Sequence, residues 1–195
     1  MPHALIPTLL LQILLIGYTP GPANIYALIA SLKHTKREAL TMWTGLFVGF
    51  SIAVCIMAIL THLIGIAFGE HVVYLKYLGA AYIAYLAYKV YTSSRKAEDT
   101  GADCSFLSGM IVQMTNAKML LFDLTVFSTF VLPYSSNLTD LLKTGVWLLL
   151  AGPGANLVWL LAGSYMKSFF CRYGKLVDMV SAAALLCCAI YIIFT

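Results

Sequence analysis

Charged side chains are scarce in this chain, and their scarcity limits the class of protein it can be. Only 10% of the 195 residues are Asp, Glu, Lys or Arg, whereas about a quarter of a typical soluble domain is charged. Because 61% of the residues are hydrophobic, the polar remainder cannot cover a water-facing surface. The net charge of +4 does not indicate a nucleic-acid partner, since the basic residues are not clustered on one polar face. The composition indicates an integral membrane protein surrounded by the lipid bilayer.

Motifs for metals, disulfides and export signals are also missing. The five cysteines show no CxxC spacing, so small buried hydrophobic side chains are the favoured interpretation. The four histidines have no paired spacing typical of haem or metal, and we expect no metal and no cofactor. No basic segment precedes the first apolar run, and no small-residue cleavage site follows it. We therefore expect that run to be a retained membrane span rather than a signal peptide.

Long apolar runs are what the chain does contain. A membrane-spanning helix needs about 20 apolar residues. Six runs have about this length: 4–32, 39–68, 72–92, 105–132, 141–166 and 176–194. None shows the period-two alternation of barrel strands, so the runs predict helices. The expected fold is an all-α integral membrane protein with six transmembrane helices.

Lys and Arg are distributed unevenly between the connections of these spans. Nine lie beside the odd-numbered connections, namely Lys33, Lys36, Arg37, Lys89, Arg95, Lys96, Lys167, Arg172 and Lys175. On the other side lie only Lys76 and Lys143. Because basic residues are enriched in cytoplasmic loops, we expect the odd-numbered connections in the cytoplasm. Both termini would then lie outside.

A polar stretch over 93–104 divides the chain nearly in half. It predicts a cytoplasmic linker between a first three-helix unit, 1–92, and a second, 105–195. The halves echo each other weakly, as in Thr44-Gly45 and Thr144-Gly145. Three spans per half is an odd number, so the halves would have opposite orientations, as in the inverted repeats of many secondary transporters.

The first run is interrupted by Thr19-Pro20-Gly21-Pro22, followed by Asn24. Proline costs about 3 kcal/mol inside a helix and glycine about 1 kcal/mol, whereas proline suits the first position of a helix. One interpretation is a simple proline kink. The other is a break, after which a half-helix beginning at Pro22 would present free N–H groups that favour a carboxylate. Both interpretations remain open from this stretch alone.

The fourth run contains Asn116 and Lys118 near its middle, followed by Asp123. A Lys at the centre of a membrane helix costs about 2.5–3.5 kcal/mol on insertion scales, so such residues usually face a cavity or a partner. Lys118 is suited to attract a carboxylate, and Asp123 is a candidate to bind an ammonium or carry a proton. A structural Lys118–Asp123 pair is the alternative, although five residues place them about 140° apart around a helix.

The fifth run contains Gly152-Pro153-Gly154 and then Asn156. Its composition is similar to the interruption of the first run. Because the intramembrane Lys118 favours a cavity, we expect a broken first helix, and we regard the fourth and fifth helices as further candidates for a break. Asn156 could reach a substrate or form a hydrogen bond between helices, and both roles remain open.

Taken together, these motifs resemble the LysE/RhtB family of amino-acid exporters over nearly the whole chain. The resemblance is carried by the Thr-Pro-Gly-Pro stretch with Asn24, by the segment 79–89, and by Asn116-Ala117-Lys118, where the family commonly has proline at the middle position. The segment 128–133 and the spacing of Gly152, Asn156, Trp159 and Gly163 add to it.

This resemblance implies efflux of small amino acids or derivatives across a bacterial inner membrane, with the proton gradient as the driving force. Cysteine, O-acetylserine or similar neutral compounds would be the leading substrates, and the protein would not be an enzyme. The resemblance also implies that the Thr-Pro-Gly-Pro break and the Asn116-x-Lys118 segment meet as the substrate site. Asp123 departs from the family pattern and is our candidate for proton coupling.

Two other classes of protein and two assembly states remain open. An intramembrane thiol-redox protein would need a reactive cysteine pair facing a cavity. A non-transporting membrane subunit would not need an intramembrane Lys beside broken helices. The GxxxG pattern from Gly45 to Gly49 favours close helix packing, within one chain or across a homodimer.

Overall fold

The computed structural model describes residues 6–68, 75–92 and 104–194, and all regular structure within them is helical. The linker predicted at 93–104 therefore lies outside the described residues except for Cys104. The elements are α1 (Ile6–Tyr18), α2 (Pro22–Lys33), α3 (Lys36–Phe68), α4 (Leu75–Thr92), α5 (Phe106–Met114), α6 (Ala117–Val126), the π-helical turn η3 (Phe127–Val131), α7 (Leu138–Leu148), the π-helical turn η4 (Leu150–Gly154), α8 (Ala155–Leu161) and α9 (Gly163–Phe194).

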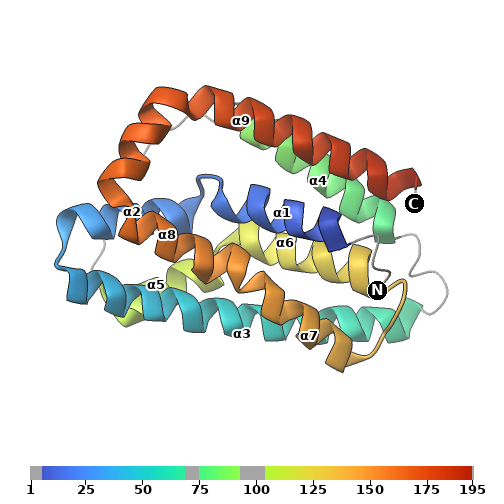
Figure 1. The fold of residues 1–195 in the computed structure, drawn as a ribbon. Helices are drawn as coiled ribbons and strands as arrows, with labels where there is room; N and C mark the ends of the chain where they lie inside the picture. The colour runs from blue at the N-terminus through green and yellow to red at the C-terminus, as the bar shows by residue number, and fades with distance from the viewer. Residues whose placement is uncertain (1–5, 69–74, 93–103, 195) are drawn as a thin grey trace.

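These helices follow the six apolar runs, with differences in how each run is divided. Among the described residues, Lys36–Ala67 and Leu138–Leu161 are long and apolar enough to cross a membrane. Two bent pairs, α1 with α2 and α5 with α6 and η3, bring the number to four if each pair counts as one span. The sixth run lies within α9, which begins at Gly163 and continues through the predicted connection at 167–175. Figure 1 shows α9 rising at one end of the bundle before it runs along α4.

The first bend, of 50° between α1 and α2, follows from the two prolines. Pro20 and Pro22 have no N–H, so the hydrogen-bond ladder of α1 cannot continue through them. Pro22 occupies the start of α2, where a missing N–H is harmless. The new ladder begins with a bond from the Ile25 N–H to the Gly21 carbonyl. The sequence motif is therefore a break between two helices rather than a shallow kink.

The second bend, of 54° between α5 and α6, forms without a proline. Thr115 ends α5, and its hydroxyl donates to the Ile111 carbonyl. Asn116 is the N-cap of α6, and its carbonyl accepts the N–H groups of Met119 and Leu120. Thr115 suits this boundary position because its short polar side chain bonds to the nearby backbone.

The fifth run differs from the expectation of a possible break. It continues from α7 through η4 into α8, and the Gly154 N–H donates to the Leu149 carbonyl, five residues back. This wider π-helical turn accommodates Pro153, and the Trp43 indole N–H donates to the Pro153 carbonyl at 2.9 Å. The run therefore stays one helix with a local bulge.

Close backbone packing joins α3 to α5. A Cβ atom at Gly45 would overlap the Phe106 carbonyl oxygen, and one at Gly49 would lie 2.6 Å from the Met110 carbonyl oxygen. The GxxxG pattern is therefore a helix–helix contact within one chain, as small residues permit in membrane proteins.

Apolar and polar side chains are distributed as expected for a protein in lipid. A stripe of exposed aliphatic side chains runs along α3 at helical spacing: Ile52, Ile56, Ile59, Leu63 and Ile66. Conversely, buried positions include the polar side chains of Gln12, Asn24, Gln113, Asn116, Asp123 and Asn156. Intramembrane polar groups of this kind usually face the interior of a bundle.

Candidate functional site

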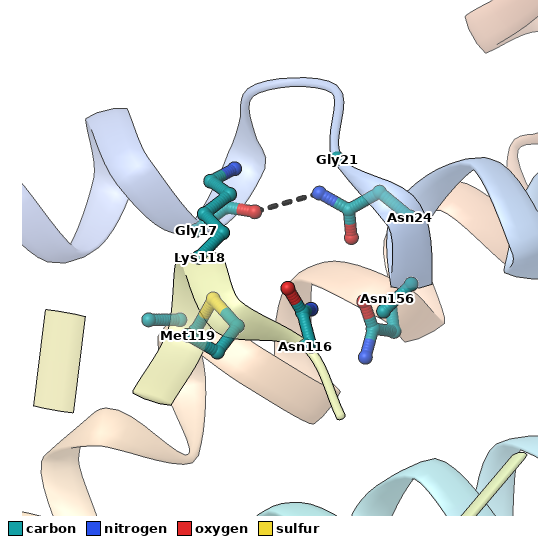
Figure 2. A pocket seen from close by; sticks show the side chains of 9 residues that line it. Gly17, Gly21, Asn24, Asn116, Lys118, Met119 and Asn156 are labelled. Atoms are coloured by element: carbon teal, nitrogen blue, oxygen red, sulfur yellow. Dashed lines mark hydrogen bonds between the residues drawn. The ribbon is translucent and has the colours of Figure 1, made fainter. Parts of the chain in front are cut away.

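A small pocket lies where the two bent helix pairs meet α8. It contains about 190 Å³ of space between atoms, part of which is open to the surroundings. Its polar lining, shown in Figure 2, consists of Asn24, Asn116, Lys118 and Asn156. Gly21 also lines it. The structure thus brings together five of the nine site residues expected from the sequence, and they come from three segments far apart in the chain.

The carbonyl groups at the end of α1 are satisfied by side chains from other segments. The Asn24 amide nitrogen donates to the carbonyls of Gly17, at 2.7 Å, and Thr19, at 2.9 Å; the first of these bonds is drawn in Figure 2. The Trp159 indole N–H donates to the Tyr18 carbonyl at 3.1 Å. Because a helix end leaves its last carbonyls without helical partners, these donors stabilise the break at Thr19–Gly21.

Lys118 lies over this break. Its ammonium donates to the Thr19 carbonyl at 3.1 Å and to the Thr19 hydroxyl at 3.0 Å. The Lys118 side chain crosses Gly21 so closely that a Cβ atom there would lie 3.1 Å from the Lys118 Cδ. An ammonium at the C-terminal end of α1 also meets the negative end of the helix dipole. Since an ammonium has three donors, one N–H remains for a further acceptor.

The start of α2 presents the opposite polarity to the same pocket. Gly21, its N-cap, has no side chain to accept the free N–H groups of the first turn. Both Gly21 and Ala23 line the pocket. Uncapped N–H groups at a helix N-terminus favour an anion. The Thr19-Pro20-Gly21-Pro22 stretch therefore lies between the end of α1 and the start of α2. Of its four residues, Gly21 lines the pocket.

Three amide groups of the pocket each have one buried atom without a hydrogen-bond partner. Asn24, Asn116 and Asn156 are only 4%, 4% and 3% exposed. The Asn24 Oδ1, the Asn116 Oδ1 and the Asn156 Nδ2 are buried without a partner. A buried polar atom without a hydrogen bond costs about 1–3 kcal/mol, so a polar guest in the pocket would relieve this cost.

Asp123 lies apart from the pocket, two turns further along α6 than Asn116. It is fully buried, and neither carboxyl oxygen has a hydrogen-bond partner. Lys118 donates to Thr19 instead, so the alternative of a structural Lys118–Asp123 pair is wrong. The helical angle between the two positions is the physical reason.

Sequence reasoning missed two contributions to the site. The Trp159 indole, one turn after Asn156 on α8, caps α1, and the Trp43 indole supports η4 beside the pocket. A Trp three residues from an Asn on one helix shares its face, which is the signal that could have identified Trp159.

The cysteines offer no thiol pair at this site. None of those whose side chains are described lines the pocket, and Cys55, Cys104, Cys187 and Cys188 are all unpaired. Burial, together with the nearby charge of Glu38, raises the pKa of the Cys104 thiol, which disfavours the reactive thiolate. The Cys171 side chain lies outside the described residues.

Comparisons with known proteins identify the family to which the chain is similar. Residues 14–195 match the family described as LysE type translocator. The cysteine/O-acetylserine efflux protein of Escherichia coli (strain K12) is 34% identical over 182 residues, which are 93% of each chain. Proteins of the same name from Shigella flexneri and from Escherichia coli O1:K1 / APEC are 34% and 33% identical, again over 93% of each chain. No solved structure matches the chain.

Proposed function

Because this chain belongs to the LysE type translocator family, we propose that it exports small neutral amino acids or their derivatives in exchange for protons. Cysteine and O-acetylserine are the leading substrates, since relatives that match 93% of the chain are named as efflux proteins for them. The membrane would be a bacterial inner membrane. The observation that carries the proposal is the small polar pocket where the two broken helices meet, with Lys118 among its lining residues.

In this proposal the substrate carboxylate binds between Lys118 and the start of α2. The Lys118 ammonium has one N–H left after its two bonds to Thr19, and the first turn of α2 has no side-chain cap. Both groups favour a negative charge. Asn156 on α8 supplies a further donor, because its Nδ2 has no partner.

We further propose that the chain spans the membrane six times as two inverted repeats. Each half begins with a bent helix pair, and the long helix that follows packs on the bent pair of the other half: α3 on α5, and α8 on α2. The third spans, α4 and α9, pack on each other. Such reciprocal packing supports a two-fold relation, and rocking of the halves would alternate access to the pocket.

The bias of Lys and Arg supports an orientation with both termini outside. In Figure 1 the turn between α2 and α3 and the beginning of α9 lie at one end of the bundle, while α1 begins and α9 ends at the other.

Lys118→Ala tests the proposed site. Everted membrane vesicles with a pH gradient should accumulate radiolabelled cysteine through the wild-type protein. The variant loses the group that attracts the carboxylate, so we expect an initial rate at least tenfold lower, with partial recovery in Lys118→Arg. The matched control is Lys143→Ala, because Lys143 is exposed and forms a surface ion pair with the partly exposed Asp140. A full rate for Lys118→Ala, at equal amounts of inserted protein, contradicts the site.

A further inference from the structure

The amide of Asn24 has an orientation that its own contacts determine. Its nitrogen donates to two carbonyls at once, those of Gly17 and Thr19. The reversed amide would place an oxygen against both carbonyl oxygens, which repel it. The Asn24 Oδ1 is therefore an acceptor, and it is buried at the pocket without a donor.

Asn116 adds a second amide to the same space. As the N-cap of α6, its side chain would ordinarily accept an N–H from the first turn, yet it makes no such bond. Its Oδ1 is buried and without a partner. In Figure 2 the side chains of Asn24 and Asn116 approach the same region from α2 and from the start of α6.

The Lys118 ammonium cannot serve as the donor for both oxygens, because two of its three N–H groups already bond to Thr19. The Oδ1 atoms of Asn24 and Asn116 could therefore accept hydrogen bonds from a molecule bound in the pocket. Neutral amide oxygens suit a primary ammonium, which carries three N–H donors. Asn156 and the start of α2 offer donors in the same pocket. The pocket thus presents acceptors and donors together.

From this arrangement we propose that the Asn24 and Asn116 amide oxygens bind the free α-ammonium of the substrate. The site consequently selects zwitterionic amino acids and rejects compounds whose amino group is acylated. This inference rests on the proposed export function and adds a specificity rule to it. Under this rule a substrate needs both a carboxylate and a free ammonium, whereas its side chain can differ from one substrate to another.

Competition by amine-blocked analogues tests the rule on the unaltered protein. Uptake of radiolabelled cysteine into everted vesicles is measured with unlabelled cysteine, S-methylcysteine or N-acetylcysteine as competitor. S-Methylcysteine keeps the ammonium and the carboxylate, whereas N-acetylcysteine keeps the carboxylate and the thiol but has no ammonium. We expect N-acetylcysteine to compete at least tenfold more weakly than S-methylcysteine. Equal competition by the two analogues would overturn the proposal.

Variants of Asn116 link this preference to the amide oxygens. Asn116→Leu should weaken cysteine competition and shrink the preference over N-acetylcysteine to about threefold or less. The matched control is Gln113→Leu, because Gln113 is also a buried amide without partners but does not line the pocket. It should keep the full preference. Asn24 is left unchanged because it also holds the break together. An unaltered preference in Asn116→Leu would overturn the proposal.

The outcomes separate this inference from the export function itself. If cysteine and N-acetylcysteine cross equally well, export stands and ammonium recognition falls. If the vesicles accumulate no cysteine or O-acetylserine, the proposed export function is contradicted, and so is the specificity rule that depends on it. If uptake requires sodium ions and N-acetylcysteine competes as well as cysteine, the oxygens bind a metal cation, and the rule is overturned.

Discussion

At the scale of single residues, Lys118 and Asp123 are ionisable groups inside the bundle that have different surroundings. Lys118 has two acceptors from Thr19, whereas Asp123 has no partner for either oxygen. A buried charge without a partner costs several kcal/mol. We therefore expect Asp123 to hold its proton in this conformation, and another conformation, open to water, would be the one that releases it.

Asp123→Asn tests this role, because the amide has the same shape but cannot release a proton. We expect uptake driven by a pH gradient to fall at least tenfold in everted vesicles. Counterflow, the exchange of labelled for unlabelled cysteine without a gradient, should persist, since the pocket is unchanged. The control Asp140→Asn alters a partly exposed acid on α7 and should leave both rates intact. Gradient-driven uptake by Asp123→Asn at the wild-type rate would remove Asp123 from the coupling path.

Much of the site at this scale could be predicted from residue chemistry alone. Lys118 in an apolar run is costly enough to require a partner or cavity, and it lines the pocket with Asn116. The orientation of the Asn24 amide could not be predicted, because it depends on carbonyls seven and five residues away. The indole of Trp159 is separated from its acceptor by 141 positions, and no local pattern reports such a contact.

At the scale of helices, glycine contacts between α3 and α5 hold the two halves together. A Cβ atom at Gly45 would overlap backbone rather than a side chain that can move aside. Gly45→Ala should therefore destabilise the protein by about 1–3 kcal/mol, the usual cost of overpacking. Thermal unfolding in detergent, followed by loss of the monodisperse peak, measures this change.

The control for that measurement is Thr44→Ala, at an exposed neighbouring position on α3. It gains helix propensity and loses only a local bond to the Thr41 carbonyl, so its stability should stay close to wild type. A Gly45→Ala protein as stable as Thr44→Ala would mean that the two helices separate easily, which contradicts their close packing.

Helix boundaries were predictable where backbone chemistry decides them. The prolines in Thr19–Pro22 predicted the break that the structure contains, because they remove N–H donors from the ladder. Gly152-Pro153-Gly154 misled the same reasoning, since a π-helical turn and the Trp43 bond accommodate Pro153. The basic residues at 167–175 suggested a connection, yet α9 continues through them, because Lys and Arg are good helix formers.

At the scale of the whole molecule, the two turns that follow the bent pairs are equivalent positions of the proposed repeat. One joins α2 to α3 at His34, and the other joins η3 to α7 and includes Tyr134. Figure 1 shows these turns at opposite ends of the bundle. A parallel repeat would place them on the same side of the membrane, whereas an inverted repeat requires opposite sides.

Single-cysteine labelling distinguishes these arrangements. His34 and Tyr134 are both exposed, so His34→Cys and Tyr134→Cys can each be introduced into a chain whose five native cysteines are replaced. With a membrane-impermeant maleimide on intact spheroplasts, we expect Tyr134→Cys to react and His34→Cys to react only after the membrane is opened, because the basic residues beside His34 favour the cytoplasm.

The cysteine-free chain is the control for this labelling. It should stay unlabelled and still export cysteine, which would also eliminate a thiol-redox mechanism. Labelling of both positions from the outside would rule out the inverted repeat, and the reverse pattern would keep the repeat but invert the orientation.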